Sequence, residues 1–174
     1  MVRYAEPGTA GTVDWVESGG GPLIAVPETV LPFWAGADGE ETASDYDRAC
    51  EVDGQAGLLP VGDAAALVLG DEPAATAFLP EHGTFVRWYA GDDERDLLAS
   101  VPAALRTAEW GPETVWRVPG PVVLFDAAWP GGACEGTDHV RIPLEPGRYT
   151  VRTAHAQPGP ETWLGLVRLS PLPD

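Results

Sequence analysis

The side chains best suited to nucleophilic chemistry in this sequence are Ser18 and three histidines, His82, His139 and His155. Ser18 does not lie inside a Gly-x-Ser-x-Gly motif, and no local motif joins it to a histidine. The glycines that follow it lack the Lys-Ser/Thr ending of a phosphate-binding loop, and Pro22 stands where a helix would begin. We therefore expect a tight turn over 18–22, with a glycine at positive φ, and no catalytic residues.

The histidines and cysteines do not have the spacing of a metal site. The histidines are separated by 57 and 16 positions, and the two cysteines, Cys50 and Cys134, by 84. No His-x-His, His-Glu-x-x-His or calcium-loop pattern is present. We expect reduced thiols that pack as small apolar side chains, with no metal and no cofactor.

Acidic side chains are the most distinctive chemical feature of the chain. It contains 27 aspartates and glutamates against ten arginines and no lysine, so the net charge is −17. Residues 1–140 hold 24 of the acids and six arginines, whereas residues 141–174 hold three acids and four arginines. A negative surface attracts basic partner proteins and disfavours nucleic-acid backbones and anionic membranes. Solvated charged faces are the alternative interpretation of these acidic runs.

Two acidic runs and one tryptophan are the candidate partner-binding residues. Seven tryptophans are scattered along the chain, and most are expected in the core. Trp34 and Trp129 lie beside Gly/Pro loops, so we expect these two to be exposed anchors. The candidate set is Asp38, Glu40, Glu41, Asp45, Asp47, Glu51, Asp53, Asp92, Asp93, Glu94, Asp96 and Trp34.

Hydrophobic patterning predicts many short strands and a few short helices around these residues. Ser44, with Asp47 three residues later, predicts an N-capped two-turn helix. The pattern over residues 92–108 predicts either two helices, capped by Asp92 and Ser100, or one helix kinked at Pro102. Helix is also expected over 28–34, and strands over 13–17, 23–26, 57–61, 65–69, 74–79, 84–89, 114–118, 121–125 and 163–169.

The C-terminal region predicts a hairpin closed on Pro146-Gly147. Its apolar positions alternate over 140–144 and again over 149–153, so pairing these runs gives one buried face. This register sets Arg141 opposite Arg152, which is unfavourable unless an acid lies near. We expect internal ion pairing, with a small anion-binding patch as the alternative. A wider loop, which would shift this register, is an alternative that the sequence also allows.

Length and composition indicate a single α+β domain over 13–174, mainly antiparallel sheet with a few short helices, after a flexible tail over 1–12. The 39 glycines and prolines among 174 residues disfavour long helices. The first residues lack the apolar core of a signal peptide, and the longest apolar run, 64–69, is too short to span a membrane. We therefore expect a cytoplasmic protein with no membrane partner.

Five stretches of the chain resemble the immunity protein 21 family of bacterial polymorphic-toxin systems. The opening pattern is carried by Trp15, Glu17, Ser18, Gly20, Gly21 and Pro22. The other four stretches are residues 45–50 (DYDRAC), 69–73 (LGDEP), 86–88 (VRW) and 146–154 (PGRYTVRTA). The resemblance implies a cytoplasmic, non-enzymatic protein that binds and blocks a cognate toxin domain. The acidic charge of the chain, and not the resemblance, favours a basic, nuclease-like toxin as that partner.

Two alternatives from other classes stay open at the level of sequence. One is a small ligand-binding protein or enzyme with a pocket near Glu17, Ser18 and the arginines. The other is an acidic nucleic-acid mimic that acts on a housekeeping protein. A pocket with converging Arg, Glu and His side chains would favour the first of these, and neighbouring toxin genes would favour immunity.

Overall fold

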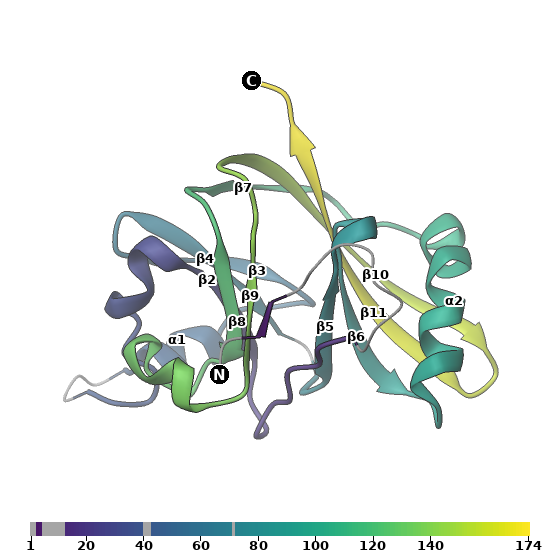
Figure 1. Cartoon of the computed structure of the whole chain (residues 1–174), viewed down its shortest axis with the longest axis horizontal. Coiled ribbons are helices and arrows are strands. Elements are labelled where there is room, and N and C mark those ends of the chain that lie inside the picture. The colour runs from purple at the N-terminus through teal and green to yellow at the C-terminus, as the bar shows by residue number, and fades with distance from the viewer. Residues whose placement is uncertain (1–2, 5–12, 40–42, 71) are drawn as a thin grey trace.

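The computed structural model describes residues 3–4, 13–39, 43–70 and 72–174, and Figure 1 shows its strands and helices. The strands are β1 (Arg3–Tyr4), β2 (Leu23–Pro27), β3 (Gly57–Val61), β4 (Ala64–Leu69), β5 (Ala75–Leu79), β6 (Thr84–Ala90), β7 (Thr114–Val118), β8 (Val122–Asp126), β9 (His139–Ile142), β10 (Gly147–Gly159) and β11 (Thr162–Leu172). The α-helices are α1 (Asp45–Cys50) and α2 (Glu94–Thr107), and the 3₁₀ helices are η1 (Glu28–Phe33), η2 (Pro80–His82) and η3 (Gly131–Gly136).

These strands form two sheets. The first sheet has the order β1-β9-β8-β2-β4-β3, and the second has the order β5-β6-β11-β10-β7. Every pairing is antiparallel except that of β1 with β9. The fold is therefore α+β and mainly antiparallel, which confirms the expectation from sequence.

The two sheets pack face to face, and helices cover their outer faces. Alternate residues of β2, β4, β8 and β9 meet alternate residues of β6, β7, β10 and β11 in a core between the sheets. The intervening residues of the first sheet pack on η1, α1 and η3, and those of the second sheet pack on α2. α1 and α2 consequently lie on opposite sides of the molecule (Figure 1).

Short-range signals in the sequence predict most of the individual elements correctly. The β3–β4 hairpin turns at Gly62-Asp63, and Gly62 has a φ of 58°. Residues 94–107 form one helix with Pro102 inside it, so the single-helix alternative is the correct one, and Asp93 is its N-cap. The strand expected over 13–17 is wrong, because only Val16 pairs there, with Thr76.

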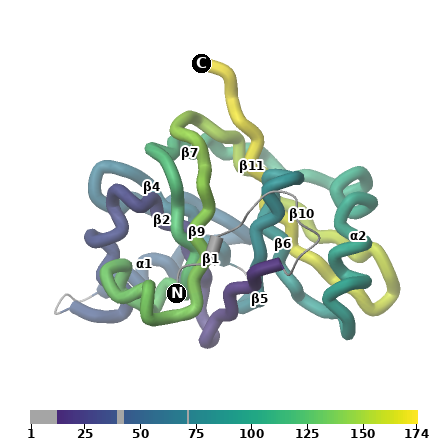
Figure 2. The backbone as a smooth tube through the Cα atoms, viewed as in Figure 1, coloured from purple at the N-terminus to yellow at the C-terminus, as the bar shows by residue number. Residues whose placement is uncertain are grey.

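The hairpin predicted over 140–153 does not exist. β9 pairs with β8 and β1 in the first sheet, whereas β10 pairs with β7 and β11 in the second. The chain crosses from one sheet to the other through residues 143–146, as Figure 2 lets the reader follow. Both strands do present one apolar face, but each buries it against the opposite sheet instead of against its neighbour in sequence.

Arg141 and Arg152 consequently do not face each other, in contrast to the predicted register. Arg141 forms an ion pair with Glu28, and Arg152 donates to the backbone carbonyl of Gly111. The tail expected over 1–12 falls largely outside the described residues, apart from β1. Among the described residues, no helix is long and apolar enough to span a membrane.

Candidate functional site

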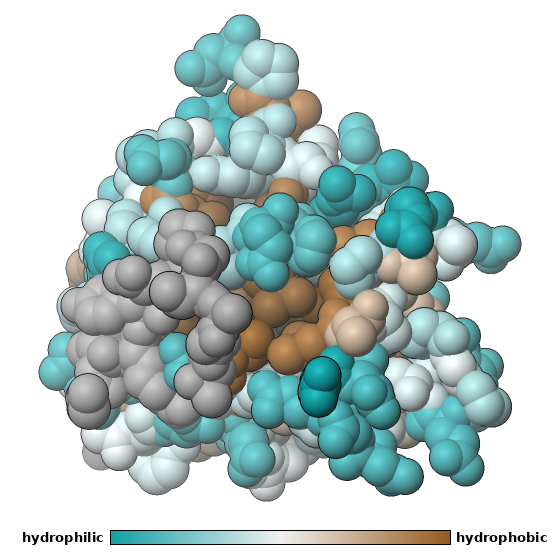
Figure 3. Space-filling model, turned by 45° about the vertical axis from the view of Figure 1, so that its right-hand side comes forward, coloured by the Kyte–Doolittle hydropathy of each residue, from teal (hydrophilic) through white to brown (hydrophobic). Residues whose placement is uncertain are grey.

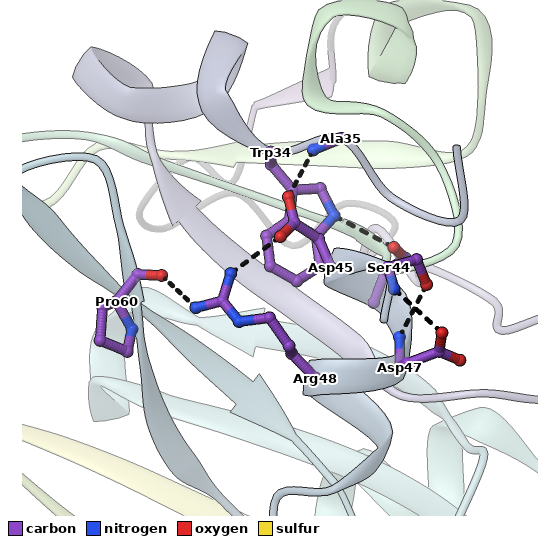
Figure 4. Close-up of polar contacts among 8 residues, drawn as sticks. Trp34, Ala35, Ser44, Asp45, Asp47, Arg48 and Pro60 are labelled. Carbon is purple, nitrogen blue, oxygen red and sulfur yellow. Dashed lines mark hydrogen bonds and ion pairs between the residues drawn. The ribbon is translucent and has the colours of Figure 1, made fainter. Parts of the chain in front are cut away.

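The N-terminus of α1 is held by a reciprocal capping box. The Ser44 hydroxyl accepts from the Asp47 backbone N–H at 3.0 Å, and the Asp47 carboxylate accepts from the Ser44 N–H at 3.0 Å (Figure 4). Hydrogen bonding of the Asp47 carboxyl with Ser44, with its backbone N–H foremost and then with its side chain, lowers the pKa of this carboxyl. Asp47 therefore stabilises the helix start.

Asp45 also has a structural partner on each of its oxygens. One oxygen accepts from the Ala35 N–H and the other from the Arg48 guanidinium, both at 2.8 Å (Figure 4). Arg48 in turn donates to the Pro60 carbonyl on β3 at 2.9 Å. In this acidic run, Asp45 and Asp47 thus hold α1 in place, although Asp47 is exposed. The other exposed acids of the run are Asp38, Glu51 and Asp53.

The glycine run forms the expected turn in front of β2. The Ser18 hydroxyl donates to the Gly21 carbonyl at 2.5 Å and accepts from the Gly20 N–H at 3.0 Å. The Gly19 N–H donates to Asp126 at the end of β8 at 2.7 Å. A Cβ added at Gly21 would lie 2.2 Å from the Tyr46 hydroxyl, so only glycine lets the turn approach α1 this closely.

An open cavity of about 320 Å³ lies where this turn, α1 and the end of β4 meet. Nine of its twelve lining residues come from three of the stretches that carry the sequence resemblance, 15–24, 45–50 and 69–73, and the other three follow α1. They are Gly20, Gly21, Pro22, Tyr46, Ala49, Cys50, Val52, Asp53, Gly54, Gly70, Glu72 and Pro73. Glu17, Ser18 and the arginines do not line it, so it is not the pocket of the ligand-binding alternative.

Tyr46 and Cys50 form the α1 wall of the cavity. A hydrogen bond with the Cys50 side chain foremost, then partial burial and electrostatic interactions with Cys50, Asp126 and Asp47, raise the pKa of the Tyr46 hydroxyl. The same cavity is thus lined by a neutral phenol and by the exposed acidic residues Asp53 and Glu72. This arrangement suits a cationic or hydrogen-bonding group of a partner.

A buried arginine supports the opposite wall. Arg87 on β6 is fully buried, and its guanidinium donates to the backbone carbonyls of Gly70 and Glu72. The turn after β4 is thereby tied to the second sheet. This role of Arg87 was not predicted from the sequence. The signal was present, because Phe85, Arg87 and Tyr89 alternate along one strand, which places Arg87 on the same buried face as Phe85.

The second acidic run lies at the other end of the molecule, beside α2. Asp93 caps this helix by accepting from the Asp96 N–H at 3.1 Å. Glu94 accepts from the Trp15 indole at 2.8 Å, and Trp15 packs on Trp88 with ring centroids 5.3 Å apart. Asp92 and Asp96 are exposed. The structure therefore does not bring the two acidic runs together.

Trp34, one of the two tryptophans expected to be exposed anchors, lies in the core. Trp34 is only 1% exposed, and its indole donates to the Ala127 carbonyl at 3.0 Å, because η1 turns the side chain onto the outer face of the first sheet. Trp129 is 50% exposed, as expected, and Trp163 is 44% exposed. Glu40 and Glu41 of the candidate set lie outside the described residues.

Apolar side chains also reach the surface. Figure 3 shows a face on which hydrophobic residues gather in a central area, with hydrophilic residues above it, below it and to its right. A second hollow, of about 380 Å³, is lined by Glu72, Tyr89, Ala90, His155 and Trp163. It shares Glu72 with the cavity at α1, so Trp163 is the exposed aromatic residue that adjoins this acidic surface.

The chain is thus a two-sheet protein in which three of the five sequence-similar stretches meet at an acidic surface cavity. A comparison with protein families shows to which family it belongs. The model of the family Immunity protein 21 matches residues 14–162, a range that contains all five of those stretches. The chain belongs to this family. No curated protein and no solved structure matches it.

Proposed function

We propose that this chain neutralises a cognate toxin domain by binding it without chemical turnover, and that the contact surface is the acidic side of the cavity at α1. The observation that carries the proposal is the Immunity protein 21 match over residues 14–162, together with the convergence of three sequence-similar stretches on that cavity. The proposal includes a cytoplasmic location and a single domain over 13–174.

Electrostatics supports a basic toxin surface as the partner. Asp53 and Glu72 line the cavity and are exposed, Glu51 is exposed at the C-terminal end of α1, and the chain as a whole carries −17. Such a surface accelerates encounter with a positively charged domain and is screened by salt. Trp163 supplies an apolar contact at the edge of the same surface, of the kind that slows dissociation.

The test measures binding kinetics with the toxin domain encoded beside this chain, prepared in an inactive form. One variant combines Glu51→Gln, Asp53→Asn and Glu72→Gln, which leaves Asp45 and Asp47 to hold α1. The matched control combines Asp92→Asn, Asp96→Asn and Glu161→Gln, which removes three exposed charges elsewhere. We expect the first variant to associate about tenfold more slowly at low salt, and the control to associate at nearly the parental rate.

Separate outcomes overturn the two parts of the proposal. If both triple variants fold and associate at the parental rate across salt concentrations, the acidic surface is not the contact. If the chain forms no complex, or protects at a small fraction of an equivalent with turnover, the binding function itself is wrong.

A further inference from the structure

The outer face of the second sheet is only partly covered by its helix. α2 packs on Ala154, Leu164 and Leu166. The rest of this face, over β7, β10 and the second half of β11, carries four of the ten arginines. We call these residues, Arg117, Arg148, Arg152 and Arg168, the arginine face.

The four arginines stand in two directly opposed pairs. Arg117 is the register partner of Arg148, and Arg152 is the register partner of Arg168. Opposed side chains in antiparallel strands have Cβ atoms about 5 Å apart, so each pair places two positive charges side by side. Three of these side chains are exposed and Arg148 is half-buried.

Neutral groups, and not carboxylates, orient these guanidinium groups. Arg152 donates to the carbonyls of Gly111 and Trp110, at 3.0 and 3.4 Å, and Arg148 donates to that of Pro173 at 3.1 Å. Arg168 lies over the Trp110 ring, 5.9 Å from its centroid. None of the four forms an ion pair with any residue that the structure describes, although the chain has an excess of 17 negative charges.

From this arrangement we infer that the arginine face binds an extended acidic polypeptide segment of a partner protein. Each opposed pair can hold one carboxylate through charge-assisted hydrogen bonds, which would relieve the repulsion within the pair. Arg148 and Arg152 are four residues apart on β10, so the two pairs are separated by about 13 Å. An extended segment with acidic residues at positions i and i+4 has the same spacing.

A polypeptide fits this face better than a nucleic acid. A nucleic-acid strand carries a charge at every phosphate, and the net charge of −17 repels such a polyanion. An acidic segment adds only a few charges. Its apolar side chains can also contact Val115, which is 50% exposed and lies beside Arg117 on β7. This inference does not depend on the toxin-binding surface at α1, which lies on the opposite side of the molecule.

The test is an NMR titration at about 20 mM salt, where exposed charges are least screened. The probe is a twelve-residue Ser/Val peptide with glutamate at positions 4 and 8, and its control has glutamine at both positions. We expect the Nε–Hε signals of the four arginines to shift with the glutamate peptide and not with the glutamine peptide. In the variant Arg117→Gln/Arg148→Gln the affinity should fall roughly tenfold, because the two ion pairs of one opposed pair with a carboxylate are lost.

The matched control variant is Arg95→Gln/Arg106→Gln, which removes two exposed arginines from α2 and should bind the glutamate peptide as the parent does. The inference is overturned if the glutamate peptide shifts none of the four signals, or if both peptides shift them equally. It is also overturned if dodecathymidylate binds this face more tightly than the peptide, since the partner class would then be nucleic acid.

Discussion

Arg87 Nη2 on β6 donates to the backbone carbonyl of Glu72 at 2.6 Å. This hydrogen bond joins two of the stretches that carry the family resemblance, 69–73 and 86–88. It also fixes a wall of the cavity at α1, because Glu72 and Gly70 both line it. The guanidinium is fully buried and lies 5.6 Å from the centre of the Tyr89 ring. The shape of the acidic surface therefore depends on a cation inside the protein.

Replacing Arg87 should destabilise the fold. Arg87→Met leaves the part-buried carbonyls of Gly70 and Glu72 without their donor, and each hydrogen bond to a charged group contributes about 1.5–3 kcal/mol. We expect the free energy of unfolding, measured by urea denaturation, to fall by about 3 kcal/mol. Arg87→Lys should recover little of this, because one ammonium does not reproduce the planar guanidinium fork.

Arg95→Met on the exposed side of α2 is the control for the loss of an arginine. Its free energy of unfolding should change by less than about 0.5 kcal/mol. A parental stability for Arg87→Met would mean that the turn after β4 is held by other contacts.

The capping box of α1 predicts a specific loss of stability in acid. Since the folded-state pKa of Asp47 lies below its ordinary value of 3.8, ionised Asp47 stabilises the native state above that value. This contribution disappears as the pH falls through the lowered pKa. Asp47→Asn should therefore be less stable than the parent at pH 7, and the difference should shrink as the pH falls below about 4.

Urea denaturation at several pH values measures this difference. Ser44→Ala removes the other half of the box and should cost about 1 kcal/mol at pH 7. If the difference between Asp47→Asn and the parent were the same at every pH, the carboxylate would not be acting through its charge.

The two cysteines should differ strongly in reactivity. Cys50 is exposed at the cavity, whereas Cys134 is 1% exposed in η3, where burial foremost and the nearby Glu135 raise the pKa of its thiol. Iodoacetamide at about pH 8 should modify one thiol per native chain, identified as Cys50 by peptide mass spectrometry, and the second only in denaturant. Equal modification rates for the two thiols would contradict the burial of Cys134.

The sequence by itself determined the local elements whose signals lie within a few residues of one another. Ser44 and Asp47 predict the cap of α1 because both hydrogen bonds of the box span three residues. Gly62-Asp63 predicts the β3–β4 turn for the same reason. The resemblance of five stretches also identifies the family, which the comparison over 14–162 confirms.

Only the tertiary structure decided which strands pair and which side chains are buried. The alternating pattern over 140–153 fits a hairpin as well as it fits two strands in different sheets, because a period of two residues shows one apolar face and not what covers it. Trp34 and Arg87 are buried by segments far away in the chain, so near neighbours do not predict their positions. The separation of the two acidic runs arises in the same way, since α1 and α2 cover different sheets.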